Sequence, residues 1–266
     1  MLGLRKVPIL FRLVGLIRYL VDLLAFYALA AKTFFRAGTA GRRLGADQRN
    51  GQIAEAGLQA LPLLSLIAII LGGIILGQAV DQLKRVGASQ SIGNLLVVLV
   101  IRELGPLIPA LLVLGRSGVS TTLTLFHMRM NGEINALESM GIDPMRYLVL
   151  PRLVGITTAV FGLTVFFNLL VIVGAYLFAG LTDLNVQAYT FFNRVADAVR
   201  WPDLVLLYVK ANLFGLIISG ICSYHGLVVR PKGQDPYGMA RSGMMSAFLG
   251  IFLLDSVFVF FYFYIR

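Results

Sequence analysis

Residues Glu133 to Arg152 read E-I-N-A-L-E-S-M-G-I-D-P-M-R-Y-L-V-L-P-R and form a polar island between two long apolar stretches. A helix of ~20 apolar residues already spans the ~30 Å hydrocarbon core of a bilayer, so a chain that only crosses it needs short polar turns. This island has room for a short helix, a stop and a second start. The sequence therefore predicts membrane helices on both sides and a segment built for docking between them.

The island begins with a predicted short helix. Ile134, Leu137 and Met140 recur at helical spacing and form one apolar face about two turns long. Glu133 and Glu138 fall on the side that faces water. A helix this short is marginal in water by itself, so we expect its apolar face to lean on a neighbour such as a partner subunit.

A stop signal follows this helix. Gly141 suits the position just after a helix end, because glycine adopts left-handed backbone angles at little cost. Asp143-Pro144 prevents simple continuation, since the residue before a proline avoids helical angles. We expect the island to break into two helical pieces.

Five apolar stretches around the island are long enough to cross a bilayer. None shows the alternating pattern of a membrane strand, so we interpret all five as helices. Their approximate bounds are 58–80, 92–114, 153–180, 203–222 and 244–264. The third must tilt, kink or extend beyond the bilayer. The predicted fold class is an all-α membrane protein with five transmembrane helices and one short docking helix.

The first fifty residues differ from the rest. Basic residues and Asp22 interrupt any spanning run, although an apolar face is present. That face is made by Phe11, Val14, Leu20, Leu23 and Leu24. The pattern favours an amphipathic interfacial helix, with a sixth span over residues 19–31 as the alternative. We therefore divide the chain into an N-terminal cytoplasmic or interfacial region, 1–50, and a transmembrane domain, 51–266.

Composition and charge support a membrane protein. Of the 266 residues, 58% are hydrophobic and 14% are charged, whereas about a quarter of residues in soluble domains are charged. If residues 116–152 share the side of the N-terminus, sixteen Lys and Arg lie on that side and five on the other. The positive-inside rule then places the N-terminus and the island in the cytoplasm. The net charge of +10 reflects this asymmetry and anionic headgroups, not nucleic-acid binding.

Signals for catalysis and metal binding are missing from the sequence. Cys222 is the single cysteine, which excludes an internal disulfide, and His127 and His225 are isolated. Residues 115–118, Gly-Arg-Ser-Gly, lack the lysine and hydroxyl of a phosphate-binding loop. We expect no enzymatic activity, no metal and no cofactor in this chain.

Four charged residues fall inside the apolar spans. Arg102 and Glu103 lie near the middle of the second span, where each costs ~2.5–3.5 kcal/mol on insertion scales. Neighbouring helical residues point about 100° apart, so these two need other partners. We pair Arg102 with Asp255, at comparable depth, and Glu103 with Lys210. Either all four only hold the bundle together, or Arg102 and Glu103 border a hydrated cavity that receives a lipid headgroup.

Two prolines follow the first pair of charges. Pro106 and Pro109 cannot donate hydrogen bonds to the carbonyls of Arg102 and Gly105. In hydrocarbon, carbonyls freed in this way must face protein or water. We expect a kinked helix that lines a cavity.

The first span carries a glycine motif. Gly73 and Gly77 form a G-x-x-x-G, and small residues at this spacing let two helices approach closely. The motif alone leaves two alternatives, a symmetric dimer seam or a packing contact inside one subunit.

Several short motifs follow one another in a fixed order between about Ile53 and Asp255. They are Arg102-Glu103-Leu104-Gly105-Pro106, Gly115-Arg116-x-Gly118, Met128-Arg129, Ala136-Leu137-Glu138-x-Met140-Gly141-x-Asp143-Pro144, Tyr147-Leu148 and Pro151-Arg152. The ordered set resembles the MlaE family, the integral-membrane permease subunits of ABC transporters that move lipids together with MCE-domain proteins. Departures identify a divergent member: Thr124 replaces a usual Glu, residues 131–133 read Asn-Gly-Glu for Thr-Glu-Gln, and residues 239–245 also differ.

The resemblance implies a role for each part of the chain. The island becomes the coupling helix, which fits a groove of a separate ABC ATPase that binds ATP and Mg. Its coupling residues are Glu133, Ile134, Leu137, Glu138, Met140, Gly141, Asp143 and Pro144. The resemblance favours Gly73 and Gly77 as the seam with a second, identical permease copy. It places the lipid path along Leu71, Ile74, Ile75, Leu76, Arg102, Glu103, Lys210 and Asp255.

The predicted function is therefore the permease subunit of an ABC transporter in the bacterial inner membrane. It would move phospholipid or a related lipid between that membrane and a periplasmic MCE protein. Residues 182–202 are either a contact for that protein or a plain interfacial connector. The alternative is an ion- or proton-coupled secondary carrier that uses the intramembrane charges as a relay. Inverted repeats would favour a carrier, but five spans do not divide into two like halves.

Overall fold

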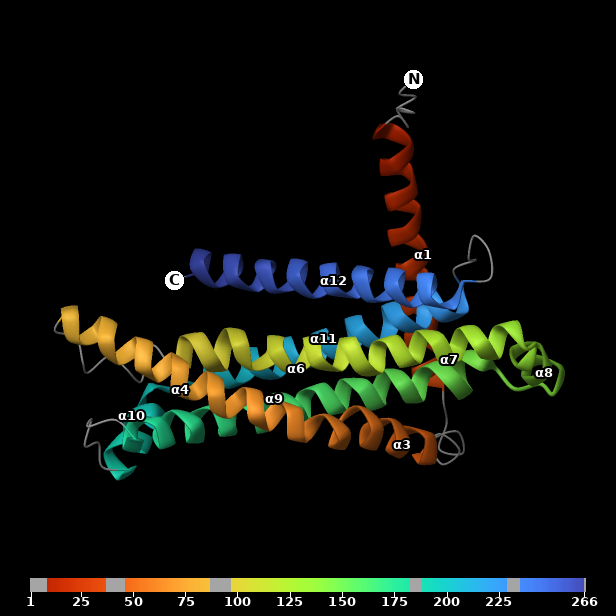
Figure 1. Ribbon diagram of the computed structural model, residues 1–266. Helices are drawn as coiled ribbons and strands as arrows, with labels where there is room; N and C mark the ends of the chain where they lie inside the picture. The colour runs from red at the N-terminus through yellow and green to blue at the C-terminus, as the bar shows by residue number, and fades with distance from the viewer. Residues whose placement is uncertain (1–8, 37–45, 87–96, 182–187, 229–234, 266) are drawn as a thin grey trace, which may run out of the picture.

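The computed structural model describes residues 9–36, 46–86, 97–181, 188–228 and 235–265 of the chain (Figure 1). Within these ranges, five helices are long and apolar enough to cross a membrane, and they run along a common direction. Their bounds are Gly51–Ala79, Val97–Met130, Met145–Gly180, Trp201–Leu227 and Pro236–Tyr262. The prediction of an all-α membrane protein with five spans is confirmed.

The spans are assembled from shorter elements that follow one another along the chain. In order, these are α1 (Ile9–Arg36), α3 (Ala46–Ala56), η1 (Leu58–Ala60), α4 (Leu61–Val86), η3 (Val97–Leu104), α6 (Gly105–Val113), η4 (Leu114–Gly118), α7 (Val119–Met130), α8 (Glu133–Ser139), η5 (Met145–Val149), α9 (Leu150–Leu181), α10 (Ala188–Ala198), α11 (Trp201–Leu227) and α12 (Pro236–Ile265). The segments η3, η4 and η5 are π-helical, and η1 is a 3₁₀ turn. We call the two ends of the bundle the α8 end and the α10 end, after the short helices found there (Figure 1).

The second span is longer than predicted. We expected it to end at residue 114 and residues 116–152 to lie outside the spans, but the helix continues through η4 and α7 to Met130. Polar side chains do not interrupt it, because they bond to helix carbonyls. The Thr122 hydroxyl donates to the Gly118 carbonyl (3.2 Å) on its own helix and lies 3.1 Å from the Cys222 carbonyl on α11. From composition we expected this segment to be a loop. In the structure it is helical, because carbonyls of its own helix and of a neighbouring helix satisfy its polar side chains.

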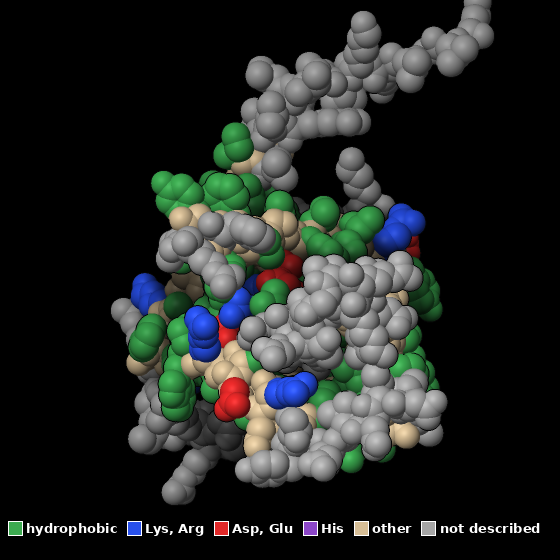
Figure 2. All heavy atoms as spheres, turned by 90° about the vertical axis from the view of Figure 1, so that its left-hand side faces the viewer, with side chains coloured by type: hydrophobic (Ala, Val, Ile, Leu, Met, Phe, Trp, Pro, Cys, Tyr) green, Lys and Arg blue, Asp and Glu red, His purple; other side chains and the backbone are tan. Residues whose placement is uncertain are grey.

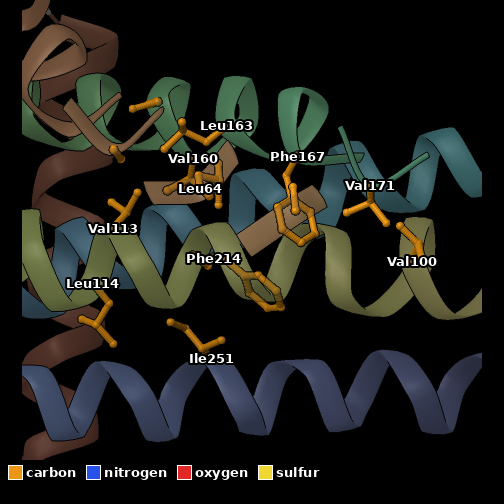
Figure 3. Close-up of a cluster of buried hydrophobic side chains, with 14 of the residues drawn as sticks. Leu64, Val100, Val113, Leu114, Val160, Leu163, Phe167, Val171, Phe214 and Ile251 are labelled. Atoms are coloured by element: carbon orange, nitrogen blue, oxygen red, sulfur yellow. The ribbon is translucent and has the colours of Figure 1, made fainter. Parts of the chain in front are cut away.

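Helix α9 lies at the centre of the bundle. It packs against α4, α11, α3 and α6, so every described span except α12 borders it. The largest fully buried apolar side chains of this core include Phe167 on α9 and Phe214 on α11 (Figure 3). This central position puts α9 in contact with elements that reach both ends of the bundle.

Glycines set the closest approach between α4 and α9. A Cβ on Gly174 would lie 2.6 Å from Ile69 Cα, and one on Gly72 would lie 2.7 Å from the Ala175 backbone nitrogen. Gly73 and Gly77, in contrast, face the ring of Phe178 in the same chain. This contact fits the alternative of packing inside one subunit, and the dimer seam at Gly73 and Gly77 stays a prediction. The motif showed that two helices meet closely but did not show which two.

Helix α1 runs across the direction of the spans near the α8 end (Figure 1), and it is not among the candidate spans. Phe26 and Ala30 pack against Val149, Leu150 and other apolar residues where η5 joins α9. The opposite face of α1 exposes apolar side chains, namely Ile17, Leu20, Val21, Leu24 and Leu29. This arrangement fits the predicted interfacial helix and not a sixth span.

Helix α12 is the least covered of the five spans. Only 11% of its most apolar stretch is buried within the chain, against 39–56% for the other four. Figure 1 shows it set apart on one side of the bundle, next to α11 and α7. Its exposed face therefore needs lipid or another chain to cover it.

Candidate functional site

The α8 helix ends as its sequence predicts. Gly141 has a left-handed φ of +73°, and its N–H donates to the Glu138 carbonyl at 2.9 Å. The next N–H, from Ile142, donates to the Leu137 carbonyl at 3.0 Å. These two bonds form a Schellman motif, which satisfies the last carbonyls of a helix by local contacts alone.

A second start follows this stop within two residues. The Asp143 carboxylate accepts a hydrogen bond from the Met145 N–H at 2.9 Å, as an N-cap residue does, and Pro144 occupies the first helical position. The predicted division of the island into two helical pieces is confirmed. Because the cap is anchored at the head of η5 and α9, α8 is tied directly to the central helix of the bundle.

The α8 surface is open. None of the residues of α8 is buried, and the apolar side chains that follow, Met140 and Ile142, are 66% and 37% exposed. Ile134 and Leu137 are half-buried, and Glu133 and Glu138 are exposed. The predicted apolar face exists, and part of it remains uncovered within the described chain. An uncovered apolar patch held by rigid local caps is typical of a contact surface.

The other end of the bundle holds a buried charge cluster centred on Lys210 of α11. The ammonium of Lys210 is fully buried; it donates to Glu103 Oε2 (2.9 Å) and forms an ion pair with Asp255 Oδ1 (2.7 Å). The predicted Glu103–Lys210 pair is confirmed. Its third hydrogen goes to the carbonyl of Arg102 at 3.1 Å.

That carbonyl is the one that Pro106 leaves without a helical donor. The π-helical segment η3 ends at the same place, directly before α6 with its prolines. Lys210 thus pairs with two carboxylates and also satisfies a backbone group that hydrocarbon could not solvate. Buried charges are tolerated where every donor has a partner of this kind.

Arg102 has a different partner from the one predicted. Its Nε lies 2.7 Å from Asp203 Oδ1, near the start of α11, and Nη1 donates to the hydroxyl of Tyr262. The predicted Arg102–Asp255 pair is wrong, because Asp255 lies instead against Lys210. The depth estimate failed because Arg102 lies level with Asp203, the third residue of α11, whereas Asp255 lies level with Lys210 further along that helix. Lys210 lies seven residues beyond Asp203, about 10 Å deeper along α11.

Asp203 was missed in the sequence. It follows Arg200 and Pro202 at the head of a helix, where an acidic residue is usually explained by capping. It does accept the Arg200 N–H with Oδ2 (3.1 Å), but its other oxygen holds Arg102. Asp203 differs from an ordinary capping residue because it is only 3% exposed and pairs with Arg102, and neither property can be read from the sequence.

A pocket of about 750 Å³ opens beside this cluster, between the start of α11 and the end of α12. Arg102, Arg200, Asp203 and Tyr262 supply its polar groups. The rest of the lining is apolar or aromatic: Trp201, Pro202, Val205, Leu206, Val209, Phe258 and Phe261. Figure 2 looks onto this end of the bundle, where basic and acidic side chains gather between apolar ones. The combination of cationic groups with a long apolar wall suits an amphiphile with an anionic head.

The predicted lipid path along α4 is not assembled at this pocket. Ile75 and Leu76 are buried in the core, Leu71 is half-buried, and Ile74 is exposed. The pocket is walled instead by α11 and α12. Of the predicted path residues, the structure brings together only Arg102, Glu103, Lys210 and Asp255.

Comparison with known proteins bears on this geometry. Residues 50–261 match the family described as Permease MlaE, which covers most of the chain and both ends of the bundle. A probable ABC transporter permease protein of Rickettsia typhi is 29% identical over 191 residues, 72% of each chain. The intermembrane phospholipid transport system permease protein MlaE of Haemophilus influenzae is 26% identical over 207 residues, 77% of this chain and 79% of that protein.

A plant relative extends the range of the similarity. The chloroplastic protein TRIGALACTOSYLDIACYLGLYCEROL 1 of Arabidopsis thaliana is 28% identical over 214 residues, 80% of this chain and 60% of that protein.

Proposed function

Because the chain belongs to the Permease MlaE family, we propose that it is the transmembrane subunit of an ABC transporter for phospholipid or a related lipid. In this proposal a separate ATPase subunit binds ATP and Mg and drives transport between the bacterial inner membrane and an MCE-domain protein. This chain contributes the path for the lipid and the surface that contacts the ATPase. The observation that carries the proposal is the exposed α8 surface, tied by Asp143 to the helix at the centre of the bundle.

The orientation follows from the same end of the molecule. We place the α8 end in the cytoplasm, where an ATPase has access to nucleotide, and the α10 end on the periplasmic side. Helix α1 lies near the α8 end, so the N-terminal region is cytoplasmic or interfacial. The excess of Lys and Arg on that side supports this orientation.

Coupling runs through contiguous packing. A shift of α8 moves η5 and α9, because Asp143 caps that helical segment. Helix α9 packs against α11, and α11 carries both Asp203 and Lys210. ATP-driven motion at one end therefore reaches the charge cluster and the pocket at the other end by rigid elements in contact.

The pocket takes the role of a lipid site in this proposal. A phosphate group would face Arg102 and Arg200, since guanidinium groups bind phosphate oxygens well. Acyl chains would lie along the apolar walls of α11 and α12. Helix α10, with exposed Phe192 beside this end, is the place where we expect the MCE-domain protein.

The second permease copy is also part of the proposal. The packing of Gly73 and Gly77 inside the chain leaves the uncovered face of α12 as the better surface for it. The predicted homodimer is thus retained, with its seam moved from α4 to α12.

Substitution at the α8 surface tests the proposal. Met140→Asp places a charge on the exposed apolar patch, and Asn135→Asp adds the same charge at an exposed position of α8 itself. We expect Met140→Asp to abolish copurification with the ATPase and lipid-stimulated ATP hydrolysis, while Asn135→Asp retains both. Normal assembly and turnover of Met140→Asp would refute α8 as the coupling surface. Lipid flux in liposomes without an ATPase, driven by an ion gradient, would establish the secondary carrier instead.

A further inference from the structure

A second pocket, of about 510 Å³, lies at the corner where α1 crosses the bundle. Its residues on α11, Asn212 and Leu216, follow Lys210 along that helix, and it shares no residue with the pocket beside Arg102. Its volume falls in the range of ligand pockets, about 300–1,000 Å³. We call it the corner groove.

The corner groove is built from single faces of two helices. Helix α1 contributes residues spaced i, i+3, i+4, i+7 and i+8, namely Tyr27, Ala30, Ala31, Phe34 and Phe35. Helix α9 contributes residues with the same spacing, namely Leu150, Leu153, Val154, Thr157 and Thr158. Each set forms one continuous stripe, because these positions share a helix face. The stripe on α9 runs about 12 Å along its axis, from Leu150 towards the bundle centre.

The floor of the corner groove is formed by α11. Gly215 lets α11 approach α9 closely, since a Cβ there would lie 2.6 Å from Thr157 Cα. The carbonyl of the next residue, Leu216, accepts a hydrogen bond from the Tyr27 hydroxyl at 3.0 Å, which fixes α1 over the groove. Burial raises the pKa of Tyr27, so its hydroxyl stays protonated and remains a donor. The groove is therefore a fixed feature of the packing of three helices.

The lining disfavours charged occupants and leaves the buried hydroxyl of Thr157 without a hydrogen-bond partner among the described residues. None of its twelve residues is charged. The hydroxyl of Thr158 and the amide of Asn212 already bond to carbonyls of their own helices, at 2.8 and 2.7 Å. Two of the three walls belong to membrane spans, and the third is an interfacial helix with an exposed apolar face. Because two walls belong to helices long and apolar enough to span a membrane, we expect hydrocarbon around the groove.

We propose that the corner groove holds one acyl chain of a glycerolipid from the leaflet at the α8 end. The acyl chain enters between α1 and α9 and lies along the α9 stripe, and the lipid headgroup stays at the level of α1. The groove shares no residue with the pocket beside Arg102 and extends from the middle of α11 towards the α8 end. This inference depends on the five-span fold and not on the proposed ATP-driven transport, so the two fail independently.

Filling the groove tests the inference. Ala31→Trp and Thr158→Phe place rings in it from opposite walls, and Ala28→Trp places the same indole on an exposed part of α1 outside it. The full complex would be placed in nanodiscs of phosphatidylethanolamine and phosphatidylglycerol, with phosphatidylglycerol spin-labelled near the end of one acyl chain. In the absence of ATP, we expect the number of motionally restricted lipids per polypeptide chain to fall by one in Ala31→Trp and in Thr158→Phe. The same number should be unchanged in Ala28→Trp. Equal lipid counts in all three variants would overturn the proposal.

Photolabelling of the unmodified chain gives a second readout that needs no variant. A phospholipid with a diazirine on its acyl chain should label residues 27–35 and 150–158 more strongly than the exposed apolar face of α4, which carries Leu63, Leu66 and Ile70. Uniform labelling of these segments would contradict a defined site. Loss of a copurifying membrane-anchored protein from Ala31→Trp, with lipid counts unchanged, would assign the groove to a partner's helix and refute the lipid.

Discussion

The α8 turn and the charge cluster lie at opposite ends of the bundle and are built in opposite ways. The turn is made by residues within a few positions of each other, from Leu137 to Met145, and its apolar side chains stay exposed. The cluster joins Arg102, Lys210 and Asp255 from three spans, with Lys210 completely buried. The difference teaches that a surface for docking can be specified locally, whereas a buried polar site depends on how distant helices pack.

The cluster should be the more costly of the two regions to break. Lys210→Met removes the partner of Glu103, Asp255 and the Arg102 carbonyl, and breaking a buried ion pair typically costs about 3–5 kcal/mol. We expect that loss in the free energy of unfolding, measured by denaturant titration of helix content in micelles. Lys32→Met, at an exposed site on α1, is the matched control and should change little. Equal stability of the two variants would show that the cluster is solvated and not structural.

A double-mutant cycle sharpens the pairing inside the cluster. Arg102→Gln and Asp203→Asn should show a coupling energy of about 0.5–3 kcal/mol, the range for residues in one charged network. The cycle of Arg102→Gln with Asp255→Asn should give a much smaller value, because Asp255 pairs with Lys210. Coupling in the second cycle larger than in the first would restore the pairing predicted from sequence.

The α8 turn should respond to a backbone change and not to a loss of burial. Gly141→Ala puts a Cβ into open space, so its cost comes from the left-handed φ alone, about 1–2 kcal/mol. Gly162→Ala, also in open space but in a regular helix, should leave stability unchanged or slightly higher. Thermal unfolding of the two variants compares them. No difference between them would mean that the turn relaxes without strain.

The smallest effect on stability is expected on the exposed apolar patch. Met140→Asp should change the free energy of unfolding by no more than about 0.5 kcal/mol, as is usual for exposed positions. The same variant is expected to lose the ATPase. A substitution at the α8 end would then abolish partner binding without lowering stability, whereas substitution of Lys210 should lower both. A large loss of stability in Met140→Asp would show that the patch is part of the fold.

Local signals in the sequence were reliable where a few neighbouring residues decide the structure. Gly141 and Asp143-Pro144 predicted the stop and restart of the α8 turn, because capping depends on hydrogen bonds within one or two turns. Apolar length predicted the five spans, since a bilayer requires ~20 residues per helix. The extension of the second span to Met130 escaped detection because its hydroxyl groups bond to carbonyls that belong to the packed bundle.

By itself, the sequence determined the membrane class, the stop and restart at the α8 turn and the need of Arg102 and Glu103 for partners. It could also predict the Glu103–Lys210 pair from charge alone. Only the tertiary structure decided that Asp203 holds Arg102, that Gly73 and Gly77 pack against Phe178, and that α1 closes a groove over α9. The physical reason is that caps and hydropathy act along the chain, whereas ion pairs, close approaches and grooves depend on which helix faces meet.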